Sequence, residues 1–299
     1  GGGSRESEAN VGVRVQNSGE ITSAGTGSVA VSGSGGVSEG AWNYGVYVVH
    51  SGTKITSGGG DVSVTGVGGG TGNSSLNHGI MVYDAGVVTS GGSGTVTVSG
   101  TGGNSEGSSN NGVYVVGTGS TISSNGGDVS VTGLGGGTGE SEANVGVHVE
   151  DSGEITSTGS GSATVNGTGG SGSSEGTIFT WNRTPTTQSI DLTVNGSGGD
   201  DTLIVDLGGF VGLSTEITFN GGGDGSDNDT LQFQNGSSSN IAYSFTNATD
   251  GTVTIDSSTV TYTGLEPILD SLTTDHREFT FAATDDVVTL ADDGTSDNG

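Results

Sequence analysis

The side chains of this sequence that could do chemistry are mainly aspartates, and they gather toward its C-terminal end. Residues 177–299 carry 19 acidic and 2 basic residues, and 16 of the acidic ones are Asp. Several stand among Gly, Asn and Ser just before short apolar runs, where a bent chain offers carboxylate and carbonyl oxygens together. Calcium is bound by such oxygens. We therefore predict a Ca²⁺ site with these candidate ligands: Asp200, Asp201, Asp224, Asp227 and Asp229.

A metal-free interpretation of these aspartates stays open. Asp-Gly and Asn-Asp pairs also make ordinary turns between β-strands. Strings that contain Asp recur before apolar runs at Asp201, Asp229 and Asp286, separated by 28 and 57 residues. Because 57 is about twice 28, the strings indicate a loose structural period, which turns with or without a bound metal would satisfy.

The net charge of the chain restricts its partners. It is −28, from 33 acidic and 5 basic residues. Such a chain repels phosphate groups, so we expect neither nucleic acid nor an anionic membrane as a partner. The chain has no Cys, which excludes disulfides and thiolate metal sites. It has no apolar run near the roughly 20 residues that span a bilayer, so we expect no membrane insertion.

Internal repetition dominates residues 1–176. The pattern Asn-x-Gly-(Val/Ile)-x-Val begins at five places: Asn10, Asn43, Asn77, Asn110 and Asn144. The spacings are 33, 34, 33 and 34 residues, and alternate repeats resemble each other most, which gives a longer register of 67, the sum of 33 and 34. Tandem repeats of this length are typical of stacked architectures.

Each repeat is expected to form three short strands. The first strand alternates apolar residues, as at Val46 and Val48, the second holds one inward aliphatic residue, Ile55, and the third alternates again. Period two is the pattern of a strand with one buried face, and the Gly-rich stretches between the strands supply turns. One repeat buries too little apolar surface to fold alone. We therefore predict an all-β parallel β-helix, or β-solenoid, of about five 33–34-residue coils, one repeat per coil.

The Asn that opens each repeat is expected to lie above its copies at one corner of the stack. Stacked amides can hydrogen-bond to one another along such an axis. N-glycosylation is excluded at these positions, because Gly occupies the second place after each Asn, where the acceptor motif needs Ser or Thr.

The repeat strings also carry a family resemblance. GDVSVTGVGGGTG (60–72) and GDVSVTGLGGGTG (127–139), together with NYGVYVV and NNGVYVV, resemble filamentous-haemagglutinin-type repeats of very large bacterial surface adhesins. The resemblance covers residues 1–176. It implies a right-handed β-helix, an extracellular or cell-surface location, and an adhesive or stalk role.

Residues 177–299 form a second region that is rich in Asp and in aromatic residues. Side chains such as Phe219, Phe233 and Phe279 suggest a wider core, and we expect the solenoid to continue there in a different coil shape. The run GGDGSD (222–227) resembles the calcium-binding turns of repeats-in-toxin proteins, which implies Ca²⁺ held between stacked coils. Asn228 and Asp229 depart from that pattern.

These observations favour a structural or adhesive rod segment of a large secreted or cell-surface bacterial protein, which could build an extracellular filament. At roughly 4.8 Å per coil, five coils make a rod about 24 Å long. Residues 1–6 correspond to residues 135–140 in mid-repeat, so we expect further coils or a neighbouring subunit to stack on the first coil. The alternative is a glycan- or cell-binding module, in which aromatic residues near the repeat loops stack on sugars: Trp42, Tyr44, Tyr47 and Tyr114.

A polysaccharide-degrading enzyme is a weaker alternative, which arises because β-helices also carry lyases and hydrolases. Such enzymes need a base beside carboxylates, or paired carboxylates, on one strand face. Arg14 and His148 belong to an outward column that varies between repeats, so both are expected on the surface. The other candidates are expected to be isolated: Arg183, Arg277, His50, His78 and His276. We therefore predict no catalytic residues.

Overall fold

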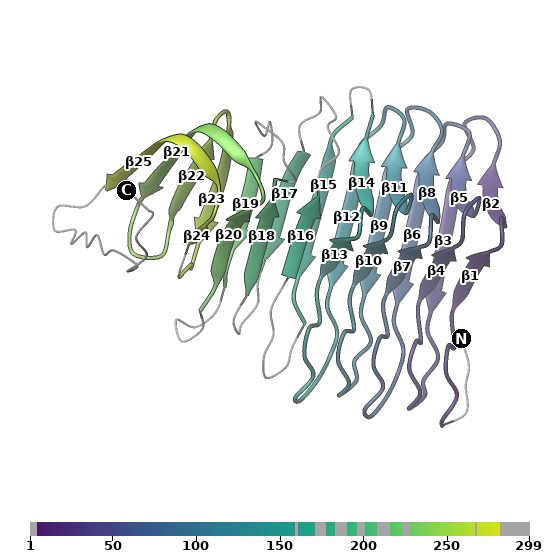
Figure 1. Cartoon of the computed structure of the whole chain (residues 1–299). Coiled ribbons are helices and arrows are strands. Elements are labelled where there is room, and N and C mark those ends of the chain that lie inside the picture. Colours follow the sequence, from purple (N-terminus) through teal and green to yellow (C-terminus); the bar gives the residue numbers. More distant parts are fainter. Residues whose placement is uncertain are drawn as a thin grey trace.

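The computed structural model describes residues 5–158, 161–170, 178–182, 190–195, 201–207, 216–222, 228–266 and 268–281 of the 299-residue chain. The described residues are all-β, and their strands wind into a parallel β-solenoid that is stacked from β1 toward β25 (Figure 1). The predicted fold class is therefore confirmed. Among the same residues, no helix has the length and apolar character needed to cross a bilayer.

Five coils of three strands each make the N-terminal part of the solenoid. The first-strand sheet contains β1 (Val13–Gln16), β4 (Val46–Val49), β7 (Ile80–Tyr83), β10 (Val113–Val116) and β13 (Val147–Glu150). The second-strand sheet contains β2 (Glu20–Ser23), β5 (Lys54–Ser57), β8 (Val87–Ser90), β11 (Thr121–Ser124) and β14 (Glu154–Ser157). The third-strand sheet begins with β3 (Val29–Ser34), β6 (Val62–Val67), β9 (Val96–Thr101), β12 (Val129–Leu134) and β15 (Ala163–Thr168).

The pairing register reproduces the spacing of the sequence repeats. Val13 pairs with Val46, an offset of 33 residues, and Val46 pairs with Ile80, an offset of 34. All pairings among the strands of these five coils are parallel. The prediction of one repeat per coil is confirmed, because each strand lies beside the same strand of the next repeat.

Alternating burial holds the coils together. Along β6 the side chains alternate between buried and exposed, and Val46, Val48 and Ile55 are fully buried. β-Branched residues fit this half-buried, pleated surface well. The third strand needs Gly at its next inward position, because the returning chain passes close by. A Cβ at Gly133 would collide with the carbonyl oxygen of Gly146.

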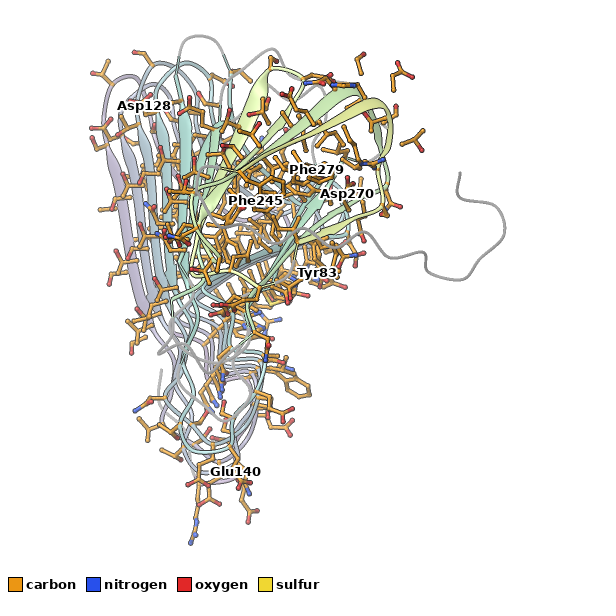
Figure 2. The ribbon with its side chains drawn as sticks, turned by 90° about the vertical axis from the view of Figure 1, so that its left-hand side faces the viewer. Tyr83, Asp128, Glu140, Phe245, Asp270 and Phe279 are labelled. Atoms are coloured by element: carbon orange, nitrogen blue, oxygen red, sulfur yellow. The ribbon has the colours of Figure 1, made fainter. Side chains whose placement is uncertain are left out.

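The long turns that follow the third strands stack into a narrow fin below the sheets, with Glu140 at its tip (Figure 2). We define the fin by residues 35–45, 68–79, 102–112 and 135–146, which lie between the third strand of one coil and the first strand of the next. Turns of neighbouring coils bond to each other through their backbones, as Gly70 N–H does to the Gly36 carbonyl oxygen at 2.9 Å.

Beyond β15 the described part of each turn holds two strands instead of three. The third-strand sheet continues through β17 (Ile190–Asn195), β19 (Glu216–Asn220) and β23 (Ser258–Thr263). A fourth sheet, which starts beside β13, holds β16 (Ile178–Asn182), β18 (Thr202–Asp206), β20 (Thr230–Gln234) and β24 (Ile268–Asp270). Phe219 and Phe233 are fully buried in this part, as the aromatic composition predicted. About two turns of the solenoid therefore follow the five predicted coils.

An antiparallel insertion then widens the third-strand sheet. The strand β22 (Gly251–Ile255) pairs antiparallel with β23 and with β21 (Ser237–Phe245), and β25 (Thr273–Phe281) pairs in parallel with β21. This sheet thus gains three strands beyond β23, whereas the fourth sheet gains only β24 beyond β20. Among the described residues, part of the inner face of the wider sheet therefore has no facing strand.

Candidate functional site

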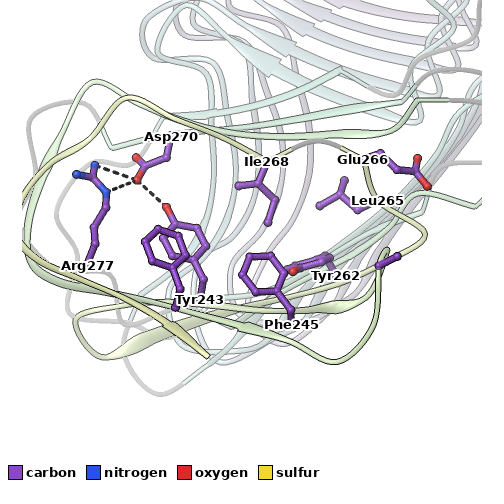
Figure 3. A pocket seen from close by; sticks show the side chains of 10 residues that line it. Tyr243, Phe245, Tyr262, Leu265, Glu266, Ile268, Asp270 and Arg277 are labelled. Carbon is purple, nitrogen blue, oxygen red and sulfur yellow. Dashed lines mark hydrogen bonds and ion pairs between the residues drawn. The ribbon is translucent and has the colours of Figure 1, made fainter. Parts of the chain in front are cut away.

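A cleft of about 570 Å³ lies against the part of the wider sheet that no described strand faces (Figure 3). Its floor is aromatic and comes from Tyr243, Phe245 and Tyr262, and the opposite wall carries Leu265 and Ile268. Charged side chains stand at its two ends. The cleft therefore combines an apolar interior with polar groups at its edges, which is the usual composition of a small-ligand site.

The aromatic floor follows from the register of β21 and β25. Because these strands pair in parallel, Tyr243 lies beside Phe279 and Phe245 beside Phe281. The ring centroids are 4.9 and 5.1 Å apart, and each pair is stacked. Phe279 nevertheless remains 53% exposed and Phe281 40% exposed. The expectation that Phe279 belongs to a closed core is therefore wrong, because no described strand covers the inner face of β25.

One end of the cleft carries a charged network around Asp270 (Figure 3). The Nη2 and Nε atoms of Arg277 lie 3.0 and 3.1 Å from Asp270 Oδ2, which also accepts a 2.6 Å hydrogen bond from the Tyr243 hydroxyl. Burial, together with the bond to Asp270, raises the pKa of Tyr243. The expectation that Arg277 is isolated is wrong, because the turn between β24 and β25 brings Asp270 to it.

Tyr262 lies deeper in the floor, and its hydroxyl has no hydrogen-bond partner among the described residues. Gly251 on the neighbouring strand makes room for it, since a Cβ there would collide with the phenol oxygen. Burial raises the pKa of Tyr262. A buried hydroxyl without a partner destabilises a fold, so this ring is held in place by packing rather than by its polar group.

The predicted Asn ladder is confirmed, and it runs from Asn10 in the first coil through the fin to Asn144. In each of the four steps from Asn10 to Asn144, the side-chain Nδ2 donates to the Oδ1 of the Asn one coil further on, at 2.7, 2.9, 2.9 and 3.1 Å. Backbone N–H groups join the ladder, as that of Asn43 donates to Asn77 Oδ1 at 3.1 Å. The buried amides are therefore used to join coils.

Sequence reasoning missed a second ladder, made of Ser, that flanks the Asn column. Its buried members are Ser38, Ser74, Ser105 and Ser141. Ser74 Oγ donates to Asn77 Oδ1 at 3.0 Å and lies 2.6 Å from the carbonyl oxygen of Gly40 in the preceding coil. The Ser stands five residues before the Asn in one coil and three before it in the next. This alternation, within the 67-residue register, was the signal that could have revealed the ladder.

A row of four rings runs from coil to coil, two from the fin and two from the outward face of the first-strand sheet. Tyr44 stacks on His78 with 5.3 Å between ring centroids, His78 meets Tyr114 edge-on at 5.1 Å, and Tyr114 stacks on His148 at 4.9 Å. His78 is 1% exposed, and its Nδ1 accepts the backbone N–H of Asn111 at 3.2 Å. Burial lowers the pKa of His78 to about 3. The expectation that His78 is isolated is therefore wrong.

This row also changes the interpretation of the aromatic residues proposed to bind sugars. Tyr44 is buried, with its ring engaged by Tyr47 and His78, so it is not available to a ligand. Trp42 is exposed. Arg14 is exposed, as predicted, and its guanidinium carbon lies 5.2 Å from the centroid of the Tyr47 ring. These contacts follow from the pairing of the strands, in which columns of side chains stack from coil to coil.

The structure brings together two of the five predicted calcium ligands. Asp201 and Asp229 precede β18 and β20 on adjacent turns, both are buried, and Asp229 Oδ1 accepts the backbone N–H of Asp201 at 2.8 Å. One carboxylate oxygen thus supports the stacking of two turns. Asp200, Asp224 and Asp227 lie outside the described residues. Within the described ranges no three acidic or His side chains gather as a metal site, and calcium binding stays a prediction.

The fold defines the chain as a β-solenoid repeat protein with parallel β-helix coils. Comparison with protein-family models, curated proteins and solved structures found no significant match. The resemblances to filamentous-haemagglutinin-type repeats and to repeats-in-toxin turns therefore stay expectations from the sequence.

Proposed function

We propose that the chain is a structural or adhesive rod segment of a large secreted or cell-surface bacterial protein, and a unit from which an extracellular filament can be built. The observation that supports this proposal is the direction of the polar ladders. The amides from Asn10 to Asn144 bond from coil to coil along the stack instead of converging on one point. The buried polar groups of each repeat therefore join it to the next coil along the stack.

A stack of this kind suits a spacer. In repeat proteins each unit contacts only its neighbours, so length follows the number of repeats while the cross-section stays constant. The ladders add buried hydrogen bonds to those of the three sheets, and every one of them resists the separation of two coils. In this proposal the partners of the chain are further coils or neighbouring subunits, and the chain performs no catalysis.

Insertion of whole repeats tests the rod. We would insert one or two extra copies of residues 77–143, the 67-residue register, after residue 143. Each copy should lengthen the particle by about 10 Å, two coils of roughly 4.8 Å, without widening it. Small-angle X-ray scattering measures both dimensions. An insertion that widened the particle, or that lowered its melting temperature as an unfolded segment would, would contradict the proposal.

Pulling the molecule by its ends tests whether it can carry load. Coils should detach one at a time, and each should release on the order of 110 Å of chain, the extended length of about 33 residues. Optical tweezers would record these steps. Unfolding without coil-sized steps, at forces no higher than for an Asn77→Ala variant with a broken ladder, would argue against a mechanical role.

A further inference from the structure

The cleft beside β24 and β25 is not explained by a rod. An aromatic ring that is half exposed in a spacer would only promote unwanted association. Phe279 nevertheless keeps 53% of its surface exposed, beside a hydrogen-bonded network of Arg277, Asp270 and Tyr243. The strands β22, β21 and β25 widen the sheet beyond β23 and bring these groups together. This arrangement points to a ligand.

The polar groups of the cleft differ at its two ends (Figure 3). Arg277 bonds through Nε and Nη2 to Asp270 and to the carbonyl oxygen of Leu272, so the N–H groups of its Nη1 can donate to a ligand. Glu266, at the other end, has an exposed carboxylate that can only accept while it is ionised. A fitting ligand therefore offers both acceptors and donors at its edges.

The charges around the cleft argue against an anionic ligand. Glu266 and the net charge of −28 repel an anion, and Asp270 offsets the positive charge of Arg277. The aromatic floor between them packs best against an apolar face of the ligand. A neutral molecule with a flat apolar face and hydroxyl groups around its edge meets all of these requirements.

We propose that the cleft binds an uncharged sugar residue of a glycan. The C–H face of the pyranose ring packs on Phe279 and the neighbouring aromatic floor, and its hydroxyl groups bond to Arg277 and Glu266. The volume of about 570 Å³ falls inside the range of roughly 300–1,000 Å³ for small-ligand sites. The proposal concerns β21 to β25 alone, so it can fail while the rod proposal stands.

The test titrates the whole chain with glucose, galactose, mannose and N-acetylglucosamine, and with glucuronate and choline as charged comparisons. Saturation-transfer NMR reports which sugar protons lie against the protein, and calorimetry gives the affinity. At least one neutral sugar should bind, and Phe279→Ala should weaken it roughly three- to tenfold through the lost ring contact. Phe281→Ala is the matched control, because Phe281 is an exposed, stacked ring on the same strand that does not line the cleft.

A second variant, Arg277→Lys, keeps the charge and removes the planar fork of donors. It should weaken the binding of the neutral sugar, while circular dichroism shows no loss of secondary structure. The proposal is overturned if no neutral sugar binds, if only glucuronate or choline binds, or if Phe279→Ala and Phe281→Ala weaken binding equally.

Discussion

Replacement of His78 by Asn should remove a pH dependence of stability that the buried ring creates. Burial lowers the pKa of His78 from 6.5 to about 3. Between these values the unfolded chain binds a proton that the folded chain does not, so the free energy of unfolding falls as the pH falls from about 6.5 toward 3. At pH 5, about 1.5 pH units below the unfolded pKa, the loss amounts to about 2 kcal/mol.

Asn is a substitution that the repeat itself supplies. Asn111 occupies the same place one coil further on, and its Oδ1 accepts the backbone N–H of Val145 at 3.1 Å. An Asn at position 78 can therefore keep the acceptor that His78 Nδ1 provides to Asn111 while removing the titrating ring. All other titratable groups are common to the two proteins, so the difference between their losses isolates the change at position 78.

The assay is urea unfolding at pH 7 and pH 5, followed by circular dichroism. The loss of unfolding free energy between the two pH values should be about 2 kcal/mol larger in the unchanged protein than in His78→Asn. Equal losses in the two proteins would refute the reasoning, because the ring would then not be buried as a neutral group. A larger loss in the variant would refute it as well.

Three further predictions concern the ladders, the floor of the cleft and calcium. Asn77→Ala should lower the unfolding free energy in urea by about 3 kcal/mol, because it leaves buried donors and acceptors unpaired. The control, Asn125→Ala at an exposed position, should change it by less than about 0.5 kcal/mol, and similar losses in the two variants would contradict the ladder. Tyr262→Phe removes a buried hydroxyl that has no partner among the described residues, so it should raise the unfolding free energy by about 1 kcal/mol. Tyr243→Phe breaks the hydrogen bond to Asp270 and should lower the unfolding free energy by a similar amount, so changes of the same sign in the two variants would contradict this assignment. Chelation should lower the melting temperature of the C-terminal region, and Asp229→Asn, which keeps the acceptor for Asp201 N–H, should abolish that dependence; a variant as sensitive to calcium as the parent would exclude this carboxylate as a ligand.

The repeat coils could be predicted because their information is local and periodic. Alternation such as that of Val62 and Val64 fixes which face of a strand is buried, and the spacing of the repeats fixes the register. The Asn ladder follows directly, since residues one repeat apart lie on top of each other. The Ser ladder was harder to find, because its spacing alternates and breaks the simple period.

The cleft could not be predicted in the same way. Tyr243 and Phe279 are stacked because β22 is inserted antiparallel beside β21 and the chain then returns along β25. Alternation in the sequence shows that Gly251–Ile255 is a strand, but it does not show the direction of its neighbours. The ion pair of Asp270 and Arg277 likewise depends on how the chain turns from β24 into β25. The direction in which strands pair is decided by tertiary contacts, and the sequence does not reveal these contacts where the regular repeat has ended.

The alternating Ser has a consequence for how such a gene can grow or shrink. Coils with Ser three residues before the Asn, such as Ser74, bond to a Gly carbonyl oxygen, whereas Ser105, five residues before its Asn, bonds to the carbonyl oxygen of Ser74. Loss or duplication of one repeat would set two coils of the same kind side by side and misalign these partners. Recombination should therefore preserve the ladder only when it adds or removes repeats in pairs. The gene would then gain or lose two coils at a time, although the structure repeats with each single coil.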